Sequence, residues 1–79
     1  MKFANFPFVT DAEIEELLAS MTLAQLLHSE WMNKKKFEFY QKSPFYHANS
    51  EKHKAHLSCY DRISRRSAEK ATELEGGTS

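Results

Sequence analysis

Two helix starts follow one another in residues 9–26, which read VTDAEIEELLASMTLAQL. At the first, the Thr10 side chain can cap the helix, and Glu13, three residues later, can accept a hydrogen bond from the Thr10 amide. Thr22 and Gln25 repeat this arrangement. An apolar residue precedes each threonine, as in a hydrophobic staple. The pattern predicts two consecutive helices.

Helix-breaking residues are scarce and lie where helices should end. The 79 residues include only two Gly, at 76 and 77, and two Pro. The Ser43-Pro44 step should end the second helix near Gln41, because proline lacks the amide and the residue before it disfavours the α region. The third helix should begin after Pro44 or near Asn49 or Ser50. The predicted helices run over about residues 11–20, 23–41 and from between residues 43 and 50 to about 75.

Apolar residues at helical spacing predict how the two longer helices pack. One stripe of the helix over 23–41 holds Leu23, Ala24, Leu26, Leu27, Trp31 and Phe37, with Tyr40 at its edge. The stripe of the third helix holds Leu57, Tyr60, Ile63, Ala68, Ala71 and Leu74. Ser64 and Ser67 lie within the second stripe, and such small side chains let a neighbouring helix approach closely.

We therefore expect an all-α fold: a small helical bundle with a short N-terminal helix and an antiparallel hairpin of two longer helices. The helix over 11–20 and the arm with Phe3, Phe6 and Phe8 should close one end. Residues 1–75 should form one domain, with residues 1–9 as a Phe-rich arm and residues 76–79 as a disordered tail.

The charges are segregated along the chain although the net charge is zero. Residues 33–70 hold ten Lys and Arg against four acids, whereas residues 1–32 hold one against five. Aromatic residues are interleaved with the basic ones, which indicates a surface for an anionic or mixed partner. A core of this size supplies roughly 3 to 5 kcal/mol, so complex formation or homo-oligomerisation is expected.

The expected location is cytoplasmic. The single cysteine, Cys59, cannot form a disulfide within the chain, and the first residues lack the apolar region of a signal peptide. No window approaches the roughly 18 uninterrupted apolar residues of a membrane-spanning helix. We expect no membrane partner.

Residues that could carry chemistry do not form a convincing site. The cluster His47, His53, His56 and Cys59 resembles a set of zinc ligands, but residues 53, 56 and 59 diverge around a helix by about 60° per step. A dyad of Cys59 and His56 has no third group to orient it and no Gly-rich loop for an oxyanion. We expect no catalytic residue, metal or cofactor, and no enzymatic activity.

Two surfaces are candidates for partner binding. Met32 and Phe39 are seven residues apart and share the face opposite the predicted stripe, flanked by lysines. The alternatives are that the helix over 11–20 or the arm covers them, or that they are scattered exposed apolar residues without a function. The three arginines of the third helix could form a docking edge or simply a solubilising face. The predicted partner-binding residues are Met32, Lys35, Lys36, Phe39, Lys42, Arg62, Arg65 and Arg66.

The function predicted from these features is that of a small non-enzymatic interaction protein. It would bind, and inhibit or regulate, a larger protein or protein–nucleic acid complex through its basic and aromatic helical surface. The sharpest version is a phage-type inhibitor of a host nucleic-acid-processing or defence complex, by analogy of size alone. One alternative is direct nucleic-acid binding through the Lys and Arg side chains. Another is a structural coiled-coil oligomer.

Overall fold

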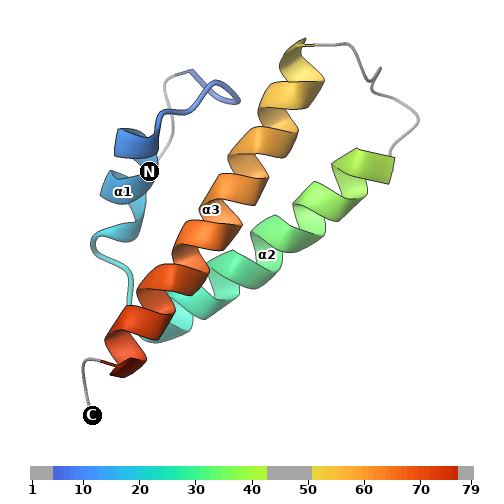
Figure 1. Cartoon of the computed structure of the whole chain (residues 1–79). Coiled ribbons are helices and arrows are strands. Elements are labelled where there is room, and N and C mark those ends of the chain that lie inside the picture. Colours follow the sequence, from blue (N-terminus) through green and yellow to red (C-terminus); the bar gives the residue numbers. More distant parts are fainter. Residues whose placement is uncertain (1–4, 43–50, 77–79) are drawn as a thin grey trace.

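Three helices make up the part of the chain that the structure describes. The computed structural model describes residues 5–42 and 51–76. Within them, α1 is Asp11–Leu18, α2 is Leu23–Lys42 and α3 is Glu51–Gly76 (Figure 1). The described residues contain no strand. The predicted all-α fold is therefore confirmed, while the end of the arm at residues 1–4, the connection over 43–50 and residues 77–79 lie outside the described residues.

Both predicted capping boxes are present. Thr10 Oγ1 accepts from the Glu13 amide at 3.2 Å, and Glu13 Oε1 accepts from the Thr10 amide at 3.0 Å. Thr22 and Gln25 make the same reciprocal pair at 3.2 and 2.9 Å. These bonds satisfy amides that a helix start leaves open, which explains why the two boundaries could be predicted.

The two longer helices form an antiparallel hairpin, as predicted, and α1 packs against α3 (Figure 1). In this view α3 lies between the other two helices. The core consists of apolar side chains contributed by all three helices and by the residue before the first cap. Its buried members are Val9, Ile14, Leu18, Leu26, Cys59, Ile63 and Ala71.

Small polar side chains fill the middle of the hairpin. Ser29 and Ser67 are both buried, and their hydroxyl oxygens lie 3.0 Å apart in a hydrogen bond. Asn33 Nδ2 donates to the Ser29 carbonyl at 2.8 Å, and the Ser64 hydroxyl donates to the Glu30 carbonyl at 3.2 Å. Each buried hydroxyl therefore has a partner, as buried polar groups require.

The packed face of α2 differs from the predicted stripe. Leu26 is buried at 1% exposure, but Trp31 is 56% exposed and Leu27 is 45% exposed. Ala24 is exposed as well. The prediction that Ala24, Leu27 and Trp31 belong to the packed stripe was therefore wrong. Helix α2 meets α3 through Leu26, Ser29 and neighbouring polar groups instead. Hydrophobic periodicity therefore identified the wrong centre for the buried face.

An aromatic cluster closes the end of the hairpin near the arm. The Phe6 ring meets the His56 ring edge-on at 5.2 Å, and the Tyr40 ring stacks on His56 at 5.1 Å. The Phe6 and Tyr40 rings also contact the Tyr60 ring, with centroid distances of 6.1 and 5.3 Å respectively. The arm thus reaches the α2–α3 hairpin through Phe6, while Phe3 lies outside the described residues.

Candidate binding surface

All three arginines form ion pairs within the chain. Arg62 Nη1 lies 2.9 Å from Asp11 Oδ1, and Arg62 Nη2 donates to the Val9 carbonyl at 2.6 Å. Arg66 Nε donates to Glu15 Oε1 at 2.5 Å. These contacts join α1 to α3, so Arg62 and Arg66 have a structural role that the sequence did not reveal.

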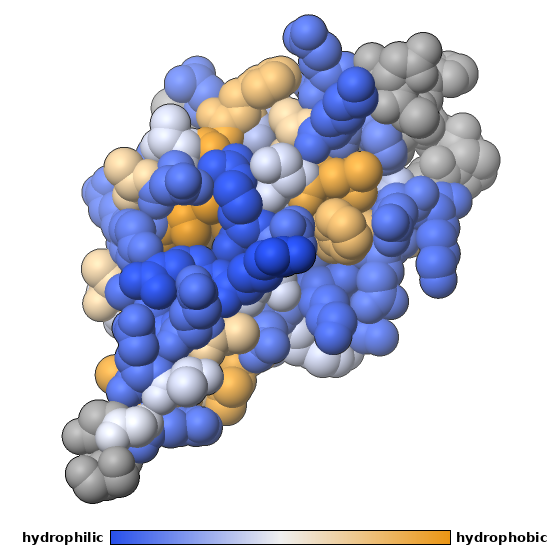
Figure 2. Space-filling view, viewed as in Figure 1, coloured by the Kyte–Doolittle hydropathy of each residue, from blue (hydrophilic) through white to orange (hydrophobic). Residues whose placement is uncertain are grey.

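The ion pair between Glu15 of α1 and Arg66 of α3 shifts the pKa of both side chains. The hydrogen bond from Arg66 lowers the pKa of Glu15, and the same bond raises the pKa of Arg66. Lys70 Nζ adds a second cation 3.5 Å from Glu15 Oε2. Hydrophilic side chains accordingly form a band across the middle of the face shown in Figure 2.

Arg65 is paired too, but only with a neighbour on its own helix. Its Nε lies 3.1 Å from Asp61 Oδ1, one turn earlier on α3, and its side chain is 79% exposed. An exposed pair of this kind contributes roughly 0 to 1 kcal/mol. The three predicted arginines therefore lie on α3 with their charges already matched by acids.

The lysines of α2 are different. Lys34, Lys35, Lys36 and Lys42 are exposed, and none forms an ion pair with any described residue. The Lys36 ammonium lies 5.7 Å from the centroid of the Tyr60 ring, a cation–π distance. Among the described residues, four lysines without an ion pair lie on α2 and two, Lys52 and Lys54, lie on α3.

Large apolar side chains accompany these lysines. Phe39 is 65% exposed, and its ring meets the adjacent Tyr40 ring edge-on at 5.7 Å. Met32 is half-buried. The structure thus places five of the eight predicted residues on one helix, where they form what we call the α2 outer surface. Its members are Met32, Lys35, Lys36, Phe39 and Lys42.

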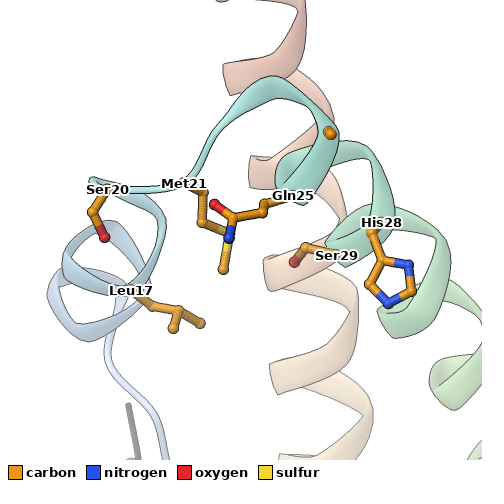
Figure 3. A pocket seen from close by; sticks show the side chains of 7 residues that line it. Leu17, Ser20, Met21, Gln25, His28 and Ser29 are labelled. Carbon is orange, nitrogen blue, oxygen red and sulfur yellow. The ribbon is translucent and has the colours of Figure 1, made fainter.

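A cleft of about 560 Å³ lies between α1 and α2. In Figure 3, Leu17 extends from α1 toward α2, while Met21 and Gln25 lie near the connection between the helices. Seven residues line this cleft, and most of them are apolar or small. They are Leu17, Ser20, Met21, Ala24, Gln25, His28 and Ser29.

The cleft is continuous with the α2 outer surface. Gln25, Met32 and Phe39 follow one another at seven-residue spacing, so they share a row along the helix. His28, Lys35 and Lys42 form a second row with the same spacing. Each row begins in the lining of the cleft and ends in the predicted patch, so the two features form one surface.

Sequence reasoning missed the cleft itself. It depends on how far α1 stands from α2, which no local pattern encodes, because α1 packs on α3 and leaves this side of α2 open. One signal was present in the chain: the row of Met32 and Phe39 extends backwards to Gln25. Following that row would have led to the helix start at Thr22 and to the connection with α1.

Two further cavities are lined by more charged residues. One, of about 310 Å³, surrounds the ion pairs of Arg62 and Arg66 with α1. The other, of about 380 Å³, lies between α2 and α3 and contains Glu30 and Glu38 besides Lys34. Neither combines apolar lining with charge of one sign.

The residues considered for chemistry are buried in the core. Cys59 is 0% exposed, and burial raises the pKa of its thiol, which disfavours the reactive thiolate. His56 Nδ1 donates to the Lys52 carbonyl at 2.8 Å. Among the described residues, no three His, Cys, Asp or Glu side chains converge to hold a metal ion; His47 lies outside them.

Comparison with known protein families, with curated proteins and with solved structures finds no match for this chain. In the part of the chain that the structure describes, no helix is long and apolar enough to cross a membrane.

Proposed function

We propose that this chain is a small interaction protein that binds a larger macromolecular partner through the α2 outer surface. The observation that carries the proposal is Phe39, a large apolar side chain that is 65% exposed on a helix whose lysines have no ion pair with described residues. Apolar residues rimmed by charge are typical of protein-binding sites.

The apolar side chains and the lysines of this surface contribute differently to the free energy of binding, and this difference favours a protein partner. Covering an exposed aromatic side chain gains about 25 cal/mol for each Å² removed from water, and such anchors usually dominate interface energy. Rim lysines mainly increase the rate of encounter and select the partner. We therefore expect Phe39 and Met32 to hold the partner, and Lys35, Lys36 and Lys42 to select it.

Binding of this kind suits an inhibitor or adaptor. A chain of 79 residues can block or bridge a larger surface by occupying it, which requires a rigid helix and no chemistry. The predicted coiled-coil oligomer is not favoured, because the α3 residues it would use, among them Ile63 and Ala71, are buried within the chain's own core.

Direct nucleic-acid binding is the second candidate, favoured by one observation. Trp31 is 56% exposed and lies close in sequence to Lys34 and Lys35, a combination that could stack a base and contact phosphates. Affinity would then fall steeply with added salt, with a slope set by the number of phosphates contacted. A protein partner anchored by Phe39 and Met32 would show a much weaker dependence on salt.

Affinity capture from cell lysate tests the proposal. The tagged chain would be incubated with lysate, with and without nuclease, and the retained material identified by mass spectrometry. We expect a discrete protein or complex that survives nuclease treatment. Capture that collapses on nuclease treatment would instead favour nucleic-acid binding, and capture of nothing specific would contradict the proposal.

A matched pair of variants shows whether the retained protein is held by the α2 outer surface. Phe39→Ala combined with Met32→Ala should abolish its retention. Leu74→Ala removes another exposed apolar side chain, 46% exposed near the end of α3, and should leave retention unchanged. Equal losses in the two proteins would place the binding surface elsewhere.

A further inference from the structure

We infer that the cleft between α1 and α2, with the α2 outer surface that continues it, receives one amphipathic helix of a partner protein, and that this helix carries carboxylates along the flank that meets α2. The inference rests on the proposed function, because it specifies the occupant of the same surface. It names the secondary structure and the charge of the segment that binds.

The shape of the surface fits a helix. Its α2 wall extends from Ala24 to Phe39, which is about 22 Å at the rise of an α-helix and corresponds to about four turns. The end near the connection holds Leu17 and Met21, and Phe39 stands exposed at the other end. An apolar stripe repeating every three to four residues could contact the whole length, as in other helix-in-groove complexes.

The arrangement of the three helices leaves a place for a fourth. Both α1 and α2 pack against α3, and the cleft of about 560 Å³ separates them (Figure 3). Helices in bundles fill such a space by packing against two neighbours at once. An added helix would cover Leu17 on one side and Met32 on the other, and so complete a four-helix arrangement.

Charge determines which flank of the added helix is acidic. Along α2, the rim of the surface carries Lys35, Lys36 and Lys42, whose ammonium groups form no ion pair with any acid of the described residues. The acids of α2, Glu30 and Glu38, line the separate cavity on the side facing α3. Carboxylates of the occupant would therefore meet cations along this wall.

The α1 side of the cleft is flanked by acids instead. Helix α1 has no basic residue, and two of its four acids, Asp11 and Glu15, pair with arginines of α3, which leaves Glu13 and Glu16. Glu13 lies one turn before Leu17 and therefore shares its face, while Glu16 is exposed. A nucleic acid carries negative charge on all sides and would meet this acidic wall. A helix can place carboxylates toward α2 and neutral or basic groups toward α1, so the two-signed surface favours a helix.

A peptide library tests the inference directly with the full chain. The library would display helical peptides of about 20 residues with a fixed apolar stripe, and each flanking position would be randomised among Glu, Lys and Gln. We expect selection on the immobilised protein to enrich Glu over Lys along one flank. Enrichment of Lys, or selection without a preference between them, would overturn the inference.

Matched variants locate the site of the selected peptides. Ala24 lines the cleft and is exposed, so Ala24→Glu should fold normally and weaken the best peptide by about tenfold or more through like-charge repulsion. Ala12→Glu makes the same change on α1 at an exposed position outside the cleft lining, and should leave affinity within about twofold. Equal effects of the two changes would contradict the assigned site.

A charge-reversal pair keeps the test independent of Ala24. Lys35→Glu on the rim should weaken the peptide by about tenfold, whereas Lys54→Glu, an exposed position on α3, should not. A nucleic acid would be contacted by both lysines. Oligothymidylate that displaces the peptide and binds more weakly to both variants would overturn the inference in favour of that partner.

Failure of the inference can be separated from failure of the proposed function. If no library member binds, but capture of a cellular protein still depends on Phe39 and Met32, the helical occupant is wrong and the binding surface stands. If capture is insensitive to those two residues, the proposed function fails, and the inference fails with it.

Discussion

Adjacent leucines of α2 provide the sharpest test of which face of this helix packs inside the protein. Leu26 is 1% exposed and belongs to the core, whereas Leu27 is 45% exposed on the outer side. Leu26→Ala and Leu27→Ala make the same chemical change one residue apart in the same helix. Any difference in stability therefore reports the burial of the two side chains.

The expected costs follow from burial. Truncating a fully buried leucine loses its transfer free energy and leaves a cavity, so Leu26→Ala should cost about 2.7 to 5 kcal/mol. Leu27 leaves no enclosed cavity, and nearly half of its surface already contacts water. Its truncation should cost at most about half of the 1.5 to 3 kcal/mol of a buried leucine, or about 1 kcal/mol. The higher helix propensity of alanine offsets about 0.2 kcal/mol of this.

Urea denaturation followed by circular dichroism measures both costs. Because a domain of this size has roughly 3 to 5 kcal/mol of stability, all samples should contain trimethylamine N-oxide so that Leu26→Ala retains a folded baseline. We expect the two variants to differ by more than about 1.5 kcal/mol. Equal costs would refute the orientation of α2, and with it the cleft and the α2 outer surface.

Three other measurements probe the contacts that position this surface. Ser29→Ala and Ser67→Ala should each cost about 1 kcal/mol, and the double variant less than their sum, in urea denaturation; strictly additive costs would argue against their buried hydrogen bond. The hydrogen bond from Arg66 is the largest cause of the lowered pKa of Glu15. The ionised pair therefore stabilises the folded protein fully above the ordinary pKa of 4.5, and this stabilisation is lost as the pH falls through the lowered pKa. Glu15→Gln should therefore flatten the acid side of the Tm–pH profile, and an unchanged profile would contradict the role of this pair. Cys59 should react with a thiol reagent only as fast as the chain opens, so the rate should rise with urea; rapid labelling of the native protein would show that the thiol is not buried.

The helix boundaries could be predicted because local chemistry determines them. Thr10 and Thr22 cap their helices with side chains three residues away, so no distant contact was needed. The end of α2 at Lys42 lies one residue beyond the predicted Gln41. The serines of α3 were also recognised as residues that allow close approach, and Ser67 is fully buried against α2.

The packed face of α2 could not be predicted from hydrophobicity. Its central contact with α3 is made by Ser29, whose hydroxyl bonds across the hairpin to Ser67, 38 residues away. Until that partner is known, a serine looks like a surface residue and Trp31 looks like a core residue. The apolar residues of α2 do recur at helical spacing, but some of them lie on a face that the chain leaves exposed.

The arginines of α3 illustrate a second limit. Along the sequence, the acids close to these arginines include Asp61 and Glu69 on the same helix. In the fold, Arg62 and Arg66 reach Asp11 and Glu15, 51 residues earlier. Local patterns do not show long-range pairs of this kind, and these pairs occupy two of the arginines that were predicted to bind a partner.

The most direct test of the central claim is the affinity of the captured partner for three purified proteins: the unaltered chain, the Met32→Ala and Phe39→Ala double variant, and Leu74→Ala. If the α2 outer surface is the binding site, the double variant should raise the Kd by a hundredfold or more, corresponding to about 2.8 kcal/mol, while Leu74→Ala should leave it unchanged. A double variant that binds as tightly as the unaltered chain would contradict the claim.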